Sequence, residues 1–299
     1  MNNPLRIAVA SGKGGTGKTT VATNLAYVAS LDGRTVAYID CDVEEPNGHL
    51  FLKPQWQERA AVTRPVPTVD EAKCTQCGRC SEICQYSAIV PLGGMVLVYA
   101  ELCHGCGGCT LVCPTGAISE SPREIGTLEM GRAGDVQFTR GLLNVGEAMS
   151  TPLIRQVKSA PPQTDLTVID APPGTSCPVI ESVRNSDFVL LVTEPTPFGL
   201  NDLKLAVEMV RSLKLPLGVV INRADTGDRH TWGYCQTHRI PILAEIPDDR
   251  RIAEAYSRGD LASSISTEYQ DLFKRLLASL TTIAAPLSST PLPSGRSTS

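Results

Sequence analysis

A glycine-rich segment close to the N-terminus constrains the fold of this 299-residue chain more than any other feature. The apolar run 5–10 precedes the segment, and a helical pattern over residues 21–30 follows it. Between Gly12 and Thr19 the residues fit the spacing G-x-x-x-x-G-K-[ST], which requires a strand before the loop and a helix after it. The segment therefore predicts a strand, a phosphate-binding loop and a helix within an α/β domain.

The residue types in this loop suit a nucleotide. Glycines allow backbone N–H groups to turn towards an anion, and the start of a helix adds partial positive charge. Lys18 would reach the β- and γ-phosphates, and the Thr19 hydroxyl would hold Mg²⁺. The alternative is a glycine-rich turn without a ligand. We expect the nucleotide contacts to come from Gly12, Gly14, Gly15, Thr16, Gly17, Lys18, Thr19 and Thr20.

Lys13 adds a second lysine to the loop, in the pattern K-G-G-x-G-K-T-T. This pattern resembles the deviant phosphate loop of the MinD superfamily, which includes the ParA partition ATPases, the Mrp cluster carriers and the nitrogenase iron protein. In that superfamily the extra lysine crosses the dimer interface to the partner's nucleotide. The resemblance therefore implies an ATPase that forms a homodimer on binding ATP, with Lys13 and Lys18 stabilising charge on the phosphates.

Two aspartate motifs follow predicted strands in the order that the superfamily requires. The strand 35–39 ends in Asp40-Cys41-Asp42, and the strand 166–169 ends in Asp170-Ala171-Pro172-Pro173-Gly174. Carboxyl ends of strands are where an open α/β sheet places its chemistry. The resemblance implies that Asp42 orients the attacking water, that Asp40 lies near Mg²⁺ and that Asp170 supports Mg²⁺ through water. Without the resemblance, the two aspartate motifs would be interpreted as ordinary turns at strand ends.

A further strand, 217–221, is followed directly by Asn222 and Arg223. In the superfamily an Asn at this strand end reads the adenine edge, and residues around Pro247 and Asp248 close over the base. The alternative for Asn222 is an ordinary residue of a strand-end turn.

Cysteine spacing identifies a second functional unit. Eight of the eleven cysteines lie between positions 74 and 113, in two runs of the form C-x₂-C-x₂-C-x₃-C. The second run repeats the first, including Gly78 as Gly107, which indicates an internal duplication. The spacing matches bacterial ferredoxins, in which three cysteines of a run bind one [4Fe–4S] cluster and the fourth binds the other. A zinc site is disfavoured because zinc takes two pairs of ligands.

This resemblance to bacterial ferredoxins implies two ligand sets. The first is Cys74, Cys77, Cys80 and Cys113, and the second is Cys103, Cys106, Cys109 and Cys84. The first run departs from the ferredoxin pattern, because Gln85 stands where proline is usual. That difference affects the surroundings of the second cluster without removing a ligand.

Cys177 lies at the offset from Asp170 at which the nitrogenase iron protein has a cysteine that ligates a cluster shared between subunits. The resemblance suggests the hypothesis that Cys177 faces the dimer axis. The alternative is a buried thiol at the start of a helix.

Charge and hydropathy limit the partners. The formal net charge is −4 and basic residues are scattered, so no nucleic-acid partner is expected. No apolar run is long enough to span a bilayer and no signal peptide precedes the first strand, so the sequence predicts a cytoplasmic protein without a membrane partner. The Ser- and Pro-rich residues 286–299 are predicted to form a disordered tail.

Together these features predict an α/β chain built on a mostly parallel sheet. A discontinuous MinD-like domain, residues 1–66 and 121–285, would carry an inserted α+β ferredoxin-like domain at 67–120. The prolines between Trp56 and Thr68 are taken as the boundary. Gly126–Gly131 and Asp135–Phe138 are expected to be short extended stretches.

Two functions remain open at this stage. The chain is either an ATP-gated electron donor that passes electrons through two clusters to a redox partner, or an Mrp-like assembly factor that carries a metal cluster to a client protein. Complete ferredoxin ligation favours the donor, whereas the ATPase body and Cys177 favour the carrier. An ATP-dependent positioning protein is a third option, disfavoured by the scattered basic residues.

Overall fold

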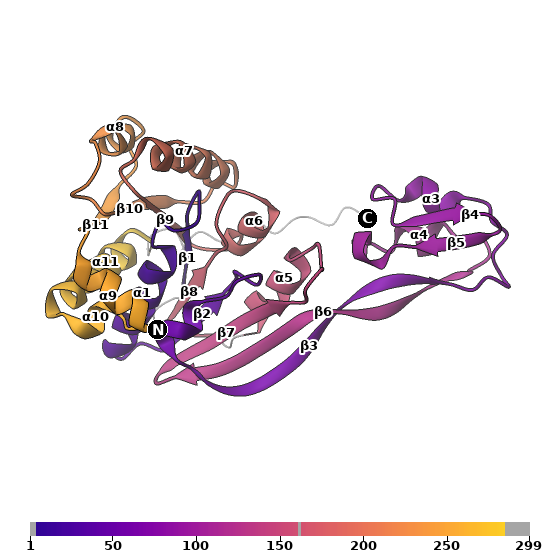
Figure 1. The fold of residues 1–299 in the computed structure, drawn as a ribbon, viewed down its shortest axis with the longest axis horizontal. Coiled ribbons are helices and arrows are strands. Elements are labelled where there is room, and N and C mark those ends of the chain that lie inside the picture. Colours follow the sequence, from indigo (N-terminus) through magenta and orange to yellow (C-terminus); the bar gives the residue numbers. More distant parts are fainter. Residues whose placement is uncertain (1–3, 161–162, 285–299) are drawn as a thin grey trace, which may run out of the picture.

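The computed structural model describes residues 4–160 and 163–284, so the predicted tail lies outside the described residues. A nine-stranded sheet runs through this part of the chain, in the order β11-β10-β9-β1-β8-β2-β7-β6-β3 (Figure 1). The parallel pairs of this sheet are formed by β1 (Leu5–Ala10), β2 (Val36–Asp40), β7 (Val136–Leu143), β8 (Leu166–Asp170), β9 (Phe188–Thr193), β10 (Leu217–Asn222) and β11 (Ile242–Ile246). The predicted α/β architecture with a mostly parallel sheet is confirmed.

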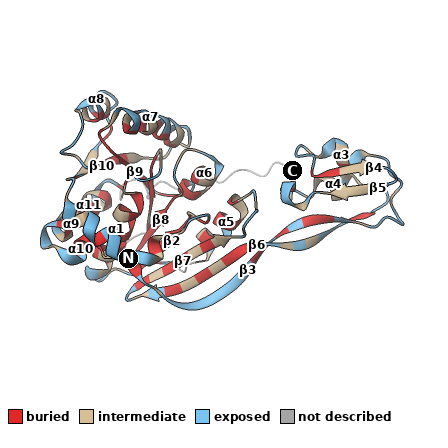
Figure 2. Cartoon of the chain, in the orientation of Figure 1, coloured by how far each residue is buried: buried red, intermediate tan, exposed pale blue. Residues whose placement is uncertain are grey.

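Continuous apolar sequences explain why the central strands lie inside. Every residue of β2, β8 and β9 is buried, as expected for parallel strands that have helices on both faces. One face packs on α1 (Lys18–Leu31), α10 (Ala262–Ile265) and α11 (Thr267–Ala284). The other packs on α5 (Thr151–Ser159), α6 (Cys177–Val183), α7 (Pro197–Ser212) and α8 (His230–Thr237). Figure 2 shows this buried centre as a set of red strands.

Two shorter helices complete the body, by which we mean the main sheet together with the helices that pack on its two faces. They are α2 (Gly48–Leu52) and α9 (Arg250–Arg258), and Phe51 of the first packs against Tyr256 of the second with ring centroids 4.9 Å apart. No helix in the described ranges has both the length and the apolar character to cross a membrane.

The most unexpected element is a long antiparallel ribbon. β3 (Gln55–Val69) pairs with β6 (Ile118–Ala133) from Gln55 opposite Arg132 to Val69 opposite Ile118. β6 also pairs with β7, so the ribbon belongs to the main sheet at one end and leaves it at the other (Figure 1). We refer to this ribbon as the arm. At about 3.3 Å per residue its strands span roughly 45 Å.

The arm differs from the boundary expected between Trp56 and Thr68. The prolines there do not end the strand, because β3 is the last strand of the sheet and needs no hydrogen bonds on its outer side. The two short extended stretches expected after the cysteines are parts of β6 and β7.

A small module fills the far end of the arm. It contains α3 (Arg79–Ile83), the hairpin β4 (Ile89–Leu92) and β5 (Met95–Val98), the 3₁₀ turn η1 (Ala100–Leu102) and α4 (Gly108–Val112). The helices α3 and α4 each begin after a glycine with positive φ, at Gly78 (78°) and Gly107 (71°). These equivalent starts agree with the duplication of the cysteine runs in the sequence.

Candidate functional site

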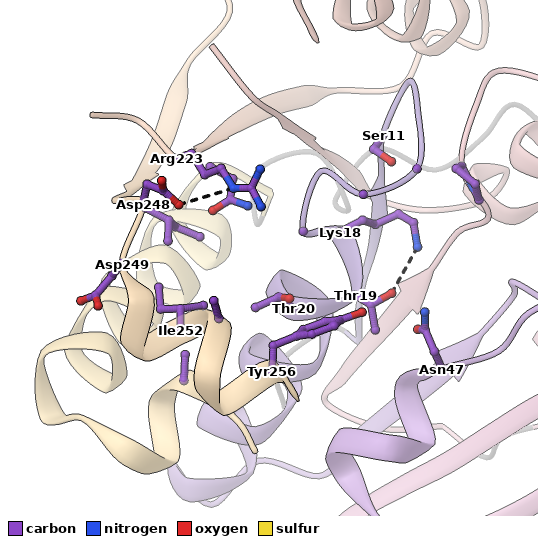
Figure 3. Close-up of a pocket in the computed structure, with 18 of the residues that line it drawn as sticks. Ser11, Lys18, Thr19, Thr20, Asn47, Arg223, Asp248, Asp249, Ile252 and Tyr256 are labelled. Carbon is purple, nitrogen blue, oxygen red and sulfur yellow. Dashed lines mark hydrogen bonds and ion pairs between the residues drawn. The ribbon is translucent and has the colours of Figure 1, made fainter. Parts of the chain in front are cut away.

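A cavity of about 460 Å³ opens at the carboxyl ends of the parallel strands (Figure 3). Its floor is the glycine-rich loop between β1 and α1, and α9 forms one wall. Of the predicted nucleotide contacts, the cavity is lined by Gly14, Gly15, Gly17, Lys18, Thr19, Thr20, Asp42, Asn222, Arg223, Pro247 and Asp248. The loop, the Asp40-Cys41-Asp42 segment after β2, which we call the first switch, and the predicted base-binding segment therefore meet at one place, as the sequence motifs require.

Two glycines of the loop are fixed by their surroundings. Gly17 has φ +89°, and a Cβ there would lie 2.4 Å from Nδ2 of Asn222. A Cβ on Gly12 would lie 2.3 Å from the backbone oxygen of Asp202 in α7. Side chains at either position would push the loop away from its neighbours. The glycines thus keep the loop close to β10 and α7.

Lys18 is held by a buried ion pair. Its Nζ lies 2.6 Å from Oδ1 of Asp170, and the Tyr38 hydroxyl donates to Oδ2 of the same carboxylate at 2.8 Å. Burial by itself lowers the pKa of Lys18, but the nearby carboxylates, Asp170 above all, outweigh burial and raise it. Lys18 therefore stays charged beside the cavity, next to the Thr19 hydroxyl at 3.5 Å.

The aspartates of the first switch are protonated more readily than ordinary carboxylic acids. Asp40 is fully buried opposite Asp170 in the sheet, and burial raises its pKa to about 8. The backbone N–H of Gly48 donates to Asp40 at 3.0 Å. Burial also raises the pKa of Asp42, to about 6. The side chains predicted to surround Mg²⁺ and the attacking water thus form a compact acidic group around Lys18.

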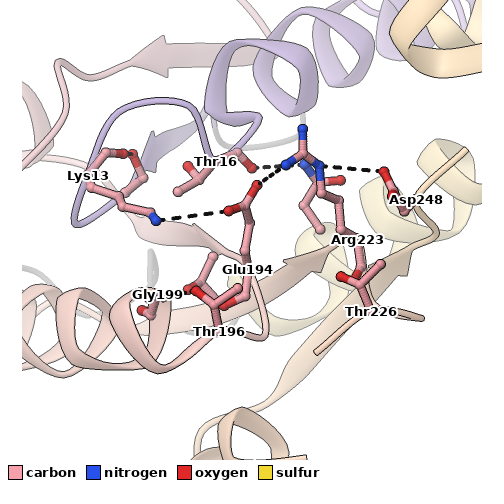
Figure 4. A network of polar contacts seen from close by, with 11 residues as sticks. Lys13, Thr16, Glu194, Thr196, Gly199, Arg223, Thr226 and Asp248 are labelled. Atoms are coloured by element: carbon pink, nitrogen blue, oxygen red, sulfur yellow. Dashed lines mark hydrogen bonds and ion pairs between the residues drawn. The ribbon is translucent and has the colours of Figure 1, made fainter. Parts of the chain in front are cut away.

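Lys13 contacts its own chain rather than the cavity (Figure 4). Its Nζ lies 4.0 Å from Oε2 of Glu194, while Nη1 of Arg223 lies 3.1 Å from Oε1 of the same carboxylate. Arg223 also approaches Asp248, with 3.6 Å between Nε and Oδ1. Glu194 was not among the residues predicted from the sequence, although its place directly after the buried strand β9 is a signal of function.

The base-binding side contains further residues that the sequence interpretation missed. Ile252 and Tyr256 of α9 line the cavity with Asp249, which caps that helix by accepting from the N–H of Arg251. The sequence feature that could have identified Ile252 and Tyr256 was the amphipathic helical pattern after Asp248. Asn222 donates its side-chain N–H to the carbonyl of Thr16 at 2.9 Å, which positions the loop. Its contact with adenine stays a prediction.

The module brings the eight clustered cysteines into two pockets. One pocket is lined by Cys74, Cys77, Cys80 and Cys113, and the other by Cys84, Cys103, Cys106 and Cys109. In each, the fourth cysteine comes from the other run, in the same grouping as the two predicted ligand sets. In the described residues, no three His, Cys, Asp or Glu side chains converge at a position suited to a single metal ion.

Backbone amides point at several of these sulfurs. Sγ of Cys74 accepts from Gln76 N at 3.4 Å, and Sγ of Cys103 accepts from Gly105 N at 3.3 Å. Cys84 and Cys113 each accept from the residue four positions later, at 3.4 and 3.3 Å. Hydrogen bonds to sulfur stabilise thiolates and tune iron–sulfur clusters. Four sulfur donors with such amides fit a [4Fe–4S] cluster at each pocket.

Cys177 is exposed and is the first residue of α6. The alternative of a buried thiol at a helix start is therefore right about the helix and wrong about burial. Its place at a dimer axis stays a prediction.

The fold and the loop define the class: this is a P-loop nucleotide-binding protein of the MinD-like α/β type. A family model for the "CobQ/CobB/MinD/ParA nucleotide binding domain" matches residues 7–262, so the chain belongs to that family of nucleotide-binding ATPases.

Relatives and solved structures agree with this membership. "Uncharacterized protein MJ0578" of Methanocaldococcus jannaschii is 32% identical, over 91% of this chain and 96% of its own length. An "Iron-sulfur cluster carrier protein" of Aquifex aeolicus is 28% identical, over 85% of this chain and 60% of its own. Among solved structures, the septum site-determining protein MinD of Pyrococcus horikoshii, complexed with Mg-ADP, is 20% identical with a TM-score of 0.59, over 96% of this chain and all of that one. That likeness shows the fold.

Proposed function

We propose that this protein is an ATP-hydrolysing iron–sulfur protein. Two copies associate on binding Mg²⁺ and ATP, and the association controls electron transfer through two [4Fe–4S] clusters to a partner protein. The observation that carries the proposal is the continuity of the sheet: β6 pairs with β7 in the nucleotide-binding body and, as part of the arm, leads to the module (Figure 1). The module contains both four-cysteine pockets.

The phosphate end of the cavity supplies the groups that ATP needs. Loop N–H groups and Lys18 would bind the phosphates, with Thr19 and Asp40 close to Mg²⁺. Lys18 would leave Asp170 for the phosphates, which frees that carboxylate to support Mg²⁺ through water. The relative in fold named as complexed with Mg-ADP supports this choice of ligand.

Hydrolysis would use residues on both copies. Asp42 lines the cavity and would orient the attacking water, whereas Lys13 would leave Glu194 and reach the nucleotide of the other copy. Hydrolysis would convert ATP and water into ADP and phosphate, and the two copies would then separate. The adenine end would be closed by Asn222, Arg223, Pro247 and Asp248 together with Tyr256.

The cysteines named above would hold one cluster at each pocket of the module. A [4Fe–4S] cluster supplies one-electron chemistry, with a potential set by hydrogen bonds to sulfur and by exposure. Cys77 and Cys106 are exposed, one at each pocket, so each pocket has a side open to a redox partner.

A second function is favoured by the names of relatives. The Aquifex aeolicus relative and others at 24–26% identity are named as iron–sulfur cluster carrier proteins. In this alternative the cluster is cargo, and the exposed Cys177 on the body is the candidate residue for receiving it.

Anaerobic purification tests both functions. The donor retains about eight iron atoms per chain, and its EPR signals change reversibly on reduction with and without Mg²⁺ and ATP. The carrier loses iron to an added apo-protein when ATP is supplied. Cys113→Ser is expected to lose about half of the iron, because one of two equivalent pockets is lost. Protein that contains no iron, or that does not bind ATP with Mg²⁺, would refute both.

A further inference from the structure

A buried group of charges joins the arm to the nucleotide-binding body. Arg64 of β3 pairs with Glu147, in the loop between β7 and α5, at 2.6 Å, and their side chains are only 3% and 2% exposed. Arg123 of β6 lies 3.5 Å from the second oxygen of Glu147. Removing one partner from such a buried group leaves an uncompensated charge, so the contact is strongly maintained.

The same arginine also contacts the module. Nη2 of Arg64 donates to the carbonyl of Ala100 at 2.8 Å, and its Nη1 donates to the carbonyl of Cys103. Ala100 begins η1, and Cys103 is the first cysteine of the second run. Arg123 adds an ion pair with Glu101 at 3.1 Å. One guanidinium thus holds both the body and the backbone at the edge of the second cysteine pocket.

On its other side, the Glu147 loop is connected to the first switch. The N–H of Leu143, at the end of β7, donates to the carbonyl of Val43 at 2.9 Å. Val43 is buried and directly follows Asp42, which lines the nucleotide cavity. After Leu143 the chain makes one turn, which is closed by a hydrogen bond of 3.0 Å from the N–H of Glu147 to the carbonyl of Asn144. This turn places Glu147 at its buried ion pair with Arg64.

We propose that Arg64 and Glu147 form a latch through which the nucleotide site controls how firmly the Cys103 side of the module is held. The proposal rests on the proposed function for the binding of ATP beside Asp42, and it adds that Asp42 and Val43 move when ATP binds. That movement displaces Leu143 and the turn that carries Glu147. Arg64 and Glu147 are positioning residues, because they act on the backbone of Cys103 and not on nucleotide or substrate.

The shape of the guanidinium makes the latch sensitive to such a displacement. A guanidinium is planar and its donors have fixed directions, so it cannot follow Glu147 and keep both module carbonyls. Once the turn moves, Arg64 loses contacts on one side. The segment 99–106 then opens more easily, and the second pocket becomes more accessible than the first.

Hydrogen exchange of the full chain, purified anaerobically, tests the latch. In the wild type, Mg²⁺ with a non-hydrolysable ATP analogue is expected to speed amide exchange of residues 99–106 by about tenfold or more, because local opening of this segment then costs less free energy. In Glu147→Gln the same segment exchanges fast without nucleotide and responds no further. Glu124→Gln is the matched control, since it makes the same change at an exposed position of β6 and should behave as wild type.

Arg64→Lys separates the latch from simple charge neutralisation. Lysine keeps the positive charge beside Glu147 but lacks the second arm that reaches the module. The latch predicts that residues 99–106 of this variant exchange fast and do not respond to nucleotide. If only the charge of Arg64 mattered, the variant would exchange, with and without nucleotide, at the same rates as wild type.

Iron content and nucleotide binding are measured on the same samples. If both are normal and residues 99–106 exchange equally with and without nucleotide, the latch is refuted and the proposed function stands. If iron or nucleotide is absent, the proposed function fails and the latch fails with it.

Discussion

Replacing Asp40 by asparagine should change how stability depends on pH. Burial opposite Asp170 raises the pKa of Asp40 to about 8, whereas in the unfolded chain it returns to its usual value near 4. Between these values the folded state binds one more proton than the unfolded state. The free energy of unfolding therefore falls as pH rises, by about 1.4 kcal/mol per pH unit. From pH 5 to pH 7 the loss is about 3 kcal/mol.

Asparagine cannot titrate, so Asp40→Asn loses this slope. The pKa of Asp42, raised to about 6, gives a decline of the same sign that ends near pH 6 in both proteins. The variant should thus gain about 3 kcal/mol relative to wild type as pH rises from 5 to 7.

Urea denaturation at pH 5, 6 and 7, followed by the fluorescence of Trp56 and Trp232, measures the difference. Asp271→Asn, an exposed position of α11, is the control and should track wild type. A difference between Asp40→Asn and wild type that does not vary with pH would show that Asp40 is ionised in the folded protein, against the reasoning.

Three further predictions concern the cavity and α6. Lys18→Met leaves the Asp170 carboxylate buried without its cation and should cost about 3–5 kcal/mol of stability in urea, most of it recovered by adding Asp170→Asn. Gly17→Ala forces a Cβ to 2.4 Å from Asn222 at φ +89° and should weaken binding of a fluorescent ATP analogue by at least about tenfold, and normal affinity would contradict the loop geometry. If Cys177 ligates a cluster at a dimer axis, Cys177→Ser should lower the iron content and change the cluster spectra. Unchanged iron, spectra and transfer rate reject that role.

Much of the lining of the cavity could be predicted because its motifs are short and local. The loop from Gly12 to Thr19 and the strand-end aspartates depend on spacing of a few residues, which a sequence displays directly. The grouping of the cysteines into two pockets was also accessible, because their spacing resembles that of bacterial ferredoxins, in which the fourth cysteine of each run binds the other cluster. These are the parts where chemistry dictates residue type.

The arm and the latch could not be predicted in the same way. β3 is rich in prolines and polar residues, and it is a strand only because β6, far along the chain, pairs with it. Arg64, Glu147 and Glu194 carry no motif, and each acquires its role from a partner that is distant in sequence. Tertiary pairing of this kind leaves no periodic signal.

The arm also determines how the module can be exchanged. Val69 and Ile118 face each other as the last pair of the ribbon, so the chain leaves and returns at a single point. A tight hairpin turn could take the place of everything between them and leave each remaining strand with its neighbour. The nucleotide-binding body is therefore a scaffold onto which another small domain could be grafted at the ribbon tip, provided that the new domain supplies acceptors for Arg64 in place of the carbonyls of Ala100 and Cys103.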